Sequence, residues 1–216
     1  MSEWYTVQPG DYMELIAEHF GFRDHHLIYD DAANVDFKKR RPNPDILLPG
    51  DSIFIPDKDP GHDEAETDKK HKFVLKSEKI KLILYVRRAG KPLAGRAYTL
   101  KVGKLVVRST TGSDGLIQHE IPIGEPEGEL TISGEPAYKR KLSIGFLHPI
   151  TTVSGVQMRL NNLGFACGPA TETDIAPYHA ALAAYQTKHS LPSRNGNLDD
   201  ATVNALRSEY DKGIAS

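Results

Sequence analysis

Cysteine is almost absent from this sequence, because Cys167 is the one cysteine in 216 residues. One thiol forms no internal disulfide, which fits a reducing compartment. No stretch of about 18 apolar residues occurs, so the sequence predicts no transmembrane helix and no membrane insertion. The chain also lacks a basic start followed by an apolar run, so we expect no secretory signal peptide. These absences predict a cytoplasmic protein, or one that leaves by a route needing no signal peptide.

An excess of basic charge is also missing. Lysine and arginine total 27 against 29 aspartate and glutamate residues, which gives a formal net charge of -2. Proteins that neutralise phosphates carry a basic face, so this balance argues against a nucleic-acid partner. The one basic cluster, residues 38–41, is interpreted as a solvated helix end rather than a binding patch.

Residue combinations that carry catalysis or hold metals are lacking as well. His25 and His26 are adjacent, so on a helix we expect them to point in different directions rather than share a metal ion. Cys167 lies in a Gly-Phe-Ala-Cys-Gly turn, which favours a small buried thiol over a nucleophile paired with His179. The sequence therefore predicts a non-enzymatic protein with no metal site and no cofactor.

Composition divides the chain into several parts, which predict a multidomain α+β protein. Residues 57–72 are charged and contain no large apolar side chain, so they are interpreted as a linker. The module before it, residues 1–56, is then expected to move relative to the rest. Residues 73–149 and 150–216 have almost no linker between them, so we expect those two parts to pack together.

The region 73–149 has the pattern of a small β-sandwich. Ile80, Leu82 and Leu84 alternate with other residues at a period of two, as in a strand. Similar alternation returns at Tyr98–Val102, at Ile117–Ile121 and at Leu130–Ile132. Glycine and proline punctuate these runs, with turns predicted at Gly90-Lys91-Pro92 and Ser113-Asp114-Gly115.

Residues 150–216 change to helical periodicity. Val153, Val156, Leu160 and Leu163 are three or four residues apart, and Gly164 follows as a stop signal. A second helix is predicted around residues 180–189. Asp199 is a plausible N-cap of a third. The connections are short, so this region predicts a three-helix bundle.

The first 56 residues resemble a LysM domain. The resemblance rests on Tyr5-Thr6-Val7-Gln8-Pro9-Gly10-Asp11, Leu15-Ile16-Ala17, Phe20-Gly21, Asn34 and Leu48-Pro49-Gly50-Asp51-Ser52-Ile53-Phe54-Ile55-Pro56. It implies a βααβ fold with two adjacent strands. Asp11 could cap the first helix, and the side chains expected to face the strands are Ile16, Phe20, Leu27 and Ile28.

LysM domains generally bind chains of N-acetylglucosamine in a groove between two loops. Carried over by position, the loop after the first strand and the loop before the last strand supply the candidate ligand-binding residues Gly10, Asp11, Tyr12, Met13, Asp45, Ile46, Leu47 and Leu48. Tyr12 and Met13 depart from the family, in which a small hydroxyl residue and leucine are usual. Packing or protein docking is the alternative role of these residues.

Residues 152–210 resemble the peptidoglycan-binding domain at the ends of many cell-wall hydrolases. The matching segments are Gly155–Phe165, Ala180–Gln186, Leu191-Pro192 and Gly196–Thr202. Candidate polymer contacts are Gln157, Arg159, Tyr185 and Gln186. The alternative interpretation places Tyr185 in the core and the other three on the helix surface.

The whole order of modules resembles a bacterial family associated with the spike proteins of type VI secretion systems. That resemblance implies a non-catalytic adaptor that docks a spike or effector protein, and export through a contractile apparatus would explain the missing signal peptide. The alternative is a cell-envelope protein that binds peptidoglycan through both ends, with avidity from two weak sites. An accessory that targets a separate hydrolase to the wall is a third possibility.

Overall fold

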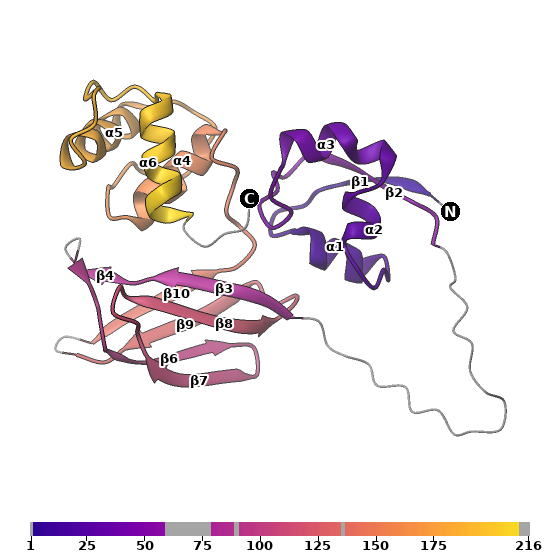
Figure 1. Ribbon diagram of the computed structural model, residues 1–216, viewed down its shortest axis with the longest axis horizontal. Coiled ribbons are helices and arrows are strands. Elements are labelled where there is room, and N and C mark those ends of the chain that lie inside the picture. Colours follow the sequence, from indigo (N-terminus) through magenta and orange to yellow (C-terminus); the bar gives the residue numbers. More distant parts are fainter. Residues whose placement is uncertain (1, 59–78, 89–90, 135–136, 212–216) are drawn as a thin grey trace.

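The computed structural model (Figure 1) describes residues 2–58, 79–88, 91–134 and 137–211. Within these ranges the chain is a mixed α/β protein in which every paired strand is antiparallel. Most of the predicted linker, from residue 59 onward, lies outside the described residues, as does the start of the central region up to residue 78. Among the described residues, no helix combines the length and the apolar character that crossing a membrane requires.

The N-terminal part pairs its first and last strands. Strand β1 (Glu3–Thr6) is antiparallel to β2 (Ser52–Ile55). Between them lie α1 (Met13–His19), α2 (His26–Tyr29), the 3-10 helix η1 (Ala32–Asn34) and α3 (Val35–Arg40). The expected second helix is therefore divided into short pieces. Asp31 divides it, because its backbone is extended and its side chain accepts a hydrogen bond from the Ala33 N–H.

Asn34 ties the helical pieces to the sheet. Its side chain is fully buried, and Nδ2 donates to the carbonyl oxygens of Ile28 (2.9 Å) and Phe54 (2.7 Å). Its Oδ1 accepts from the Phe54 N–H at 2.8 Å. Ile16 and Ile28 reach the core as expected. Leu27 does not, since 58% of it is exposed and α2 is a single turn with room for few inward positions.

Two sheets of the central part share one apolar core. A four-stranded sheet has the order β10-β9-β6-β7, and β3 pairs with β8 in a second sheet. The bounds are β3 (Lys79–Tyr85), β6 (Ala97–Val102), β7 (Leu105–Thr110), β8 (Leu116–Pro122), β9 (Glu127–Ile132) and β10 (Tyr138–Ser143). Leu100 and Leu130 from one sheet meet Ile117 and Ile121 from the other. The strands predicted from alternation are confirmed.

Two details of the central part differ from the sequence prediction. Lys91–Pro92, predicted as part of a turn, form the short strand β5, which pairs with β4 (Arg87–Arg88). Strand β10 had no predicted counterpart and is the edge strand on one side of the four-stranded sheet. Its charged side chains pair with those of β9, with Lys139 Nζ 2.8 Å from Glu129 and Lys141 Nζ 3.2 Å from Glu127.

Helices α4 (Val153–Asn162), α5 (Ala176–Lys188) and α6 (Asp200–Tyr210) share the C-terminal core. Asp199 caps α6 as predicted, because its carboxylate accepts from the Thr202 N–H at 2.8 Å. Arg87 of β4 forms an ion pair with Glu209 of α6, which is one contact between the helical part and the central part. Figure 1 shows α4, α5 and α6 gathered over the sheets.

Removing the Asn34 side chain should loosen the N-terminal part. Asn34→Ala leaves a buried N–H and buried carbonyls without partners, at a cost of roughly 1–3 kcal/mol. Trp4, the one tryptophan, contacts Phe54 with ring centroids 5.4 Å apart, so its fluorescence reports this part of the chain during urea unfolding. The transition should move to lower urea. Asn204→Ala, an exposed change on α6, is the matched control and should leave it in place. An unchanged midpoint for Asn34→Ala would contradict the role assigned to this side chain.

Candidate functional site

The two loops predicted to form a groove lie next to each other. The Met13 N–H at the start of α1 donates to the carbonyl oxygen of Pro44, at 3.1 Å. Asp11 holds the first loop, since its carboxylate accepts from the Gln8 N–H (2.7 Å) and the Tyr5 hydroxyl (2.8 Å). The prediction that Asp11 caps α1 is wrong, because the N-cap residue is Tyr12 and it makes no capping side-chain bond.

Three of the eight candidate residues in these loops are buried. Tyr12 is 4% exposed, Met13 0% and Leu47 3%, so their side chains offer no surface to a sugar ring. They belong with the packing alternative. Asp45 is exposed and the four others, Gly10, Asp11, Ile46 and Leu48, are partly exposed.

Tyr12 leaves the N-terminal core and contacts the central part. Its hydroxyl oxygen accepts a hydrogen bond from the Gly124 N–H at 3.0 Å, across 112 residues of sequence. Burial raises the pKa of the Tyr12 phenol, and the Gly124 N–H acts in the opposite direction. The phenol is therefore neutral at physiological pH, and its proton remains available to donate.

The segment between β10 and α4 closes over the same loop. The Phe146 ring packs on Gly10, where an added Cβ would lie 3.1 Å from Cζ. Gly145 approaches so closely that an added Cβ would lie 2.4 Å from the Gly10 carbonyl oxygen. The first candidate loop is thus covered by two other segments of the same chain. This differs from the expectation of an independently moving N-terminal module, because the linker composition carries no information about such contacts.

The C-terminal candidates are all inside the helical part. Gln157, Tyr185 and Gln186 are 0% exposed and Arg159 is 1% exposed. The core assignment of Tyr185 is confirmed. The interpretation of the other three as helix surface is wrong, since each is a buried polar side chain with internal hydrogen bonds. None of the four presents a surface to a polymer in this conformation.

These buried polar groups hold the loops between the helices. Gln157 Oε1 accepts from the Thr171 N–H at 2.7 Å. Gln186 accepts from the Gly196 N–H at 3.0 Å and donates to the Asn197 carbonyl at 2.7 Å. Buried polar groups need such partners because an unsatisfied one costs free energy.

Arg159 has the most connected of these side chains. Its Nε lies 2.9 Å from Asp211 Oδ1, and Nη1 donates to the carbonyl oxygens of His148 and Gly155, each at 2.8 Å. The guanidinium thus joins α4 to the segment before it and to the end of α6. Its positive charge is compensated by the Asp211 carboxylate. A buried arginine needs such a partner because an unpaired buried charge is strongly destabilising.

Cys167 and His179 do not form a nucleophile–base pair. Cys167 is fully buried and its thiol donates to the Gln157 carbonyl oxygen at 3.3 Å. Burial raises the pKa of this thiol, so the reactive thiolate is disfavoured. The His179 ring instead contacts Asp174 at 2.9 Å and the Gly196 carbonyl at 2.8 Å. The predicted burial of this thiol is confirmed.

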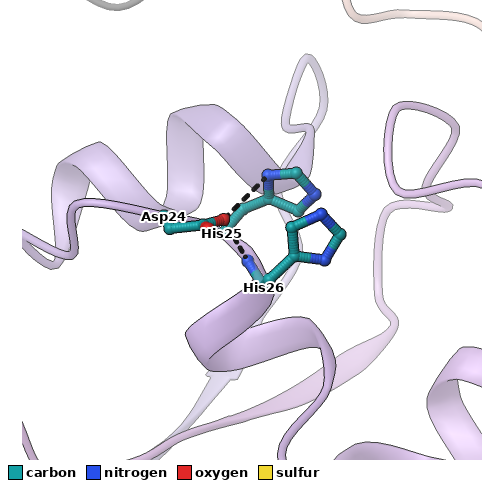
Figure 2. Close-up of side chains that lie close together, drawn as sticks. All are labelled: Asp24, His25 and His26. Atoms are coloured by element: carbon teal, nitrogen blue, oxygen red, sulfur yellow. Dashed lines mark hydrogen bonds and ion pairs between the residues drawn. The ribbon is translucent and has the colours of Figure 1, made fainter.

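His25 and His26 do not point in different directions, contrary to the prediction. Their ring centroids are 4.2 Å apart, and the ring planes meet at 32°. The prediction assumed that both residues sit within a helix, whereas His25 is the N-cap of α2 and only His26 belongs to it. Asp24 lies beside both, accepting from the His26 N–H at 2.9 Å (Figure 2). Burial, followed by the neighbouring His26, lowers the pKa of His25.

Comparison with protein-family models, curated proteins and solved structures gives no match for this chain.

Tyr12→Phe should weaken the covering of the first loop without emptying the core. The ring stays, but the Gly124 N–H loses its acceptor, a change of about 0.5–1.5 kcal/mol. Hydrogen exchange at the Gly124 amide, followed by NMR, should become several-fold faster. Tyr29→Phe is the matched control, since that hydroxyl donates to the Arg41 carbonyl within the N-terminal part. Equal exchange in Tyr12→Phe and the unaltered chain would contradict the contact.

Gly145→Ala should disturb the same contact by steric exclusion. Both Gly145 (φ +83°) and Gly95 (φ +61°) have a left-handed backbone, so alanine is strained at either position. Of the two, only Gly145 faces another backbone, since no atom of the described residues lies within 4 Å of a Cβ added to Gly95. X-ray scattering should give a larger radius of gyration for Gly145→Ala than for Gly95→Ala. Identical scattering would show that the Gly10 loop is not held against Gly145.

Arg159→Ala should destabilise the helical part. Removing one partner of a buried ion pair costs about 3–5 kcal/mol, because the other charge is left without compensation. The helical signal in circular dichroism should be lost at lower temperature. Arg207→Ala, an exposed change on α6, is the matched control. A stable Arg159→Ala protein would return Arg159 to the set of candidate binding residues.

Proposed function

We propose that this chain is a non-catalytic cytoplasmic adaptor that docks a protein partner, a spike or effector component of a type VI secretion system. The proposal includes the finer assignment of its parts as a LysM-like module, a central β-sandwich and a peptidoglycan-binding-like three-helix bundle. The assignment to a secretion system rests on the resemblance of the sequence to the family associated with type VI spike proteins. The single structural observation that favours docking over glycan binding is the covered Tyr12 loop.

A glycan site in the LysM-like module would need that loop open. Sugar recognition in such a groove uses backbone groups and apolar side chains that reach the ligand. Here Tyr12 is 4% exposed and bonds Gly124, while Phe146 packs on Gly10. A long glycan chain would have to displace these contacts before it could bind. The alternative function, peptidoglycan binding in the cell envelope, therefore carries a cost that protein docking elsewhere does not.

Trp4 offers a surface for such docking. It is 62% exposed and pairs across the sheet with Phe54, on the face opposite the buried Ile53 and Ile55. Sheet geometry explains this, because alternate residues of a strand point to opposite faces. Exposed tryptophan is enriched among the residues that dominate protein–protein binding energy. The β1-β2 face is therefore the part of the surface we assign to the partner.

Affinity purification from the native cell lysate tests the proposal. The intact chain should recover a spike or effector component identified by mass spectrometry. Trp4→Ala should reduce that recovery at least tenfold, because truncating a residue that dominates an interface typically costs at least about 2 kcal/mol of binding free energy. Val106→Ala, which also alters an exposed apolar residue (48% exposed) but on β7, is the matched control and should retain the partner.

Sedimentation with insoluble peptidoglycan tests the alternative. Asp45→Ala is the suitable variant because Asp45 is exposed, whereas changes at Tyr12 or Leu47 would disturb the core. We expect the intact chain to stay in the supernatant. Sedimentation that Asp45→Ala abolishes, together with no spike or effector recovered from lysate, would replace the adaptor by a wall-binding protein.

A further inference from the structure

The segment Asp24–His26 brings together three side chains that are all potential metal ligands. One ligand atom from each residue lies within 4.8 Å of the others, the single such group within the ranges that the structure describes. Figure 2 shows the two imidazole rings side by side, with the Asp24 carboxylate at their base. Asp24 and His26 are exposed and His25 is partly buried, so the group lies at the protein surface.

Two further carboxylates orient the imidazole rings. Glu14 Oε1 lies 3.1 Å from His25 Nδ1, and Asp30 Oδ2 lies 3.1 Å from His26 Nδ1. A carboxylate at this position accepts a hydrogen bond from the Nδ1–H group. The lone pair of the ring is then on Nε2. Histidines that bind metals usually have such a partner on the other ring nitrogen, which fixes the tautomer and the ring orientation.

Within the part of the chain that the structure describes, the Nε2 atom of His25 has no hydrogen-bond partner, although it is buried. A buried polar atom left in this state costs free energy, and such atoms in folded proteins call for an explanation. In Figure 2 the His25 ring nitrogen that carries no dashed line lies next to the His26 ring. An ion bound to this nitrogen would supply the missing partner.

We propose that Asp24, His25 and His26 bind a divalent transition-metal ion, with one carboxylate oxygen and two imidazole nitrogens as ligands. This donor set suits Zn²⁺, Ni²⁺ or Cu²⁺, whereas Mg²⁺ and Ca²⁺ require oxygen ligands. Three protein ligands leave coordination positions open to water or to a side chain of a partner. The nearby Glu14 carboxylate adds negative charge that favours a cation, whereas the charge of Asp30 is already paired with Lys38.

Isothermal titration of the full chain, without a histidine tag, with Zn²⁺ alone tests the site. The chain should bind one equivalent of Zn²⁺ more tightly than it binds any further equivalents of Zn²⁺. Asp24→Asn combined with His26→Ala should weaken this binding at least tenfold. His19→Ala is the matched control, since His19 is an exposed histidine of the same part of the chain and lies outside the cluster. It should keep the tight equivalent.

A second measurement separates metal binding from a general change in folding. Ni²⁺, which is paramagnetic, should broaden the ring signals of His25 and His26 in NMR spectra before those of the other histidines. Mg²⁺ at the same concentration should leave them unchanged. The proposal is overturned if Zn²⁺ binds the double variant as tightly as the unaltered chain, if no tight equivalent is found, or if Ni²⁺ affects all histidine rings alike.

Discussion

The contact between the Tyr12 hydroxyl and the Gly124 backbone is the constraint on which the arrangement of this protein depends. Around it, Phe146 packs on Gly10 and Gly145 approaches the same carbonyl. Residues 145–146 connect β10 to α4, so this loop of the N-terminal part lies against the connection between the other two parts. The Arg87–Glu209 pair joins the remaining two. The contacts between the parts therefore include a hydrogen bond to the backbone, an aromatic ring packed on a glycine and an ion pair.

Most of the secondary structure could be predicted because it follows from short-range patterns. The alternation in β3, β6 and β8 and the helical spacing in α4 are such patterns, and so is the Asp199 cap. The division of the second N-terminal helix could not be predicted, because it depends on a local hydrogen bond in which the Asp31 side chain accepts from the Ala33 N–H. Competition between a side chain and helical hydrogen bonding leaves little trace in hydrophobic periodicity.

The candidate sites were harder to predict, since they depend on contacts between distant residues. A sequence pattern assigns polar residues such as Gln157, Arg159 and Gln186 to the surface. In the structure each is buried and forms hydrogen bonds with backbone groups of the helical part or of the segment before it. The LysM resemblance led us to expect that the loops at residues 10–13 and 45–48 lie near each other, but it did not predict that other segments cover the first loop. The histidine pair shows a smaller version of this difficulty, because one residue at a helix boundary reverses the expected ring directions.

Strand β10 escaped prediction because its middle is the charged run Lys139, Arg140 and Lys141, and these charges have a consequence for colloidal behaviour. Open sheet edges offer unpaired backbone groups to other molecules, and natural proteins guard them with lysine and other charges. Lys139 and Lys141 project from the terminal strand of the four-stranded sheet while pairing with Glu129 and Glu127. A crowded solution of this protein is thereby protected against edge-to-edge aggregation on that side, by the residues that hid the strand from pattern analysis.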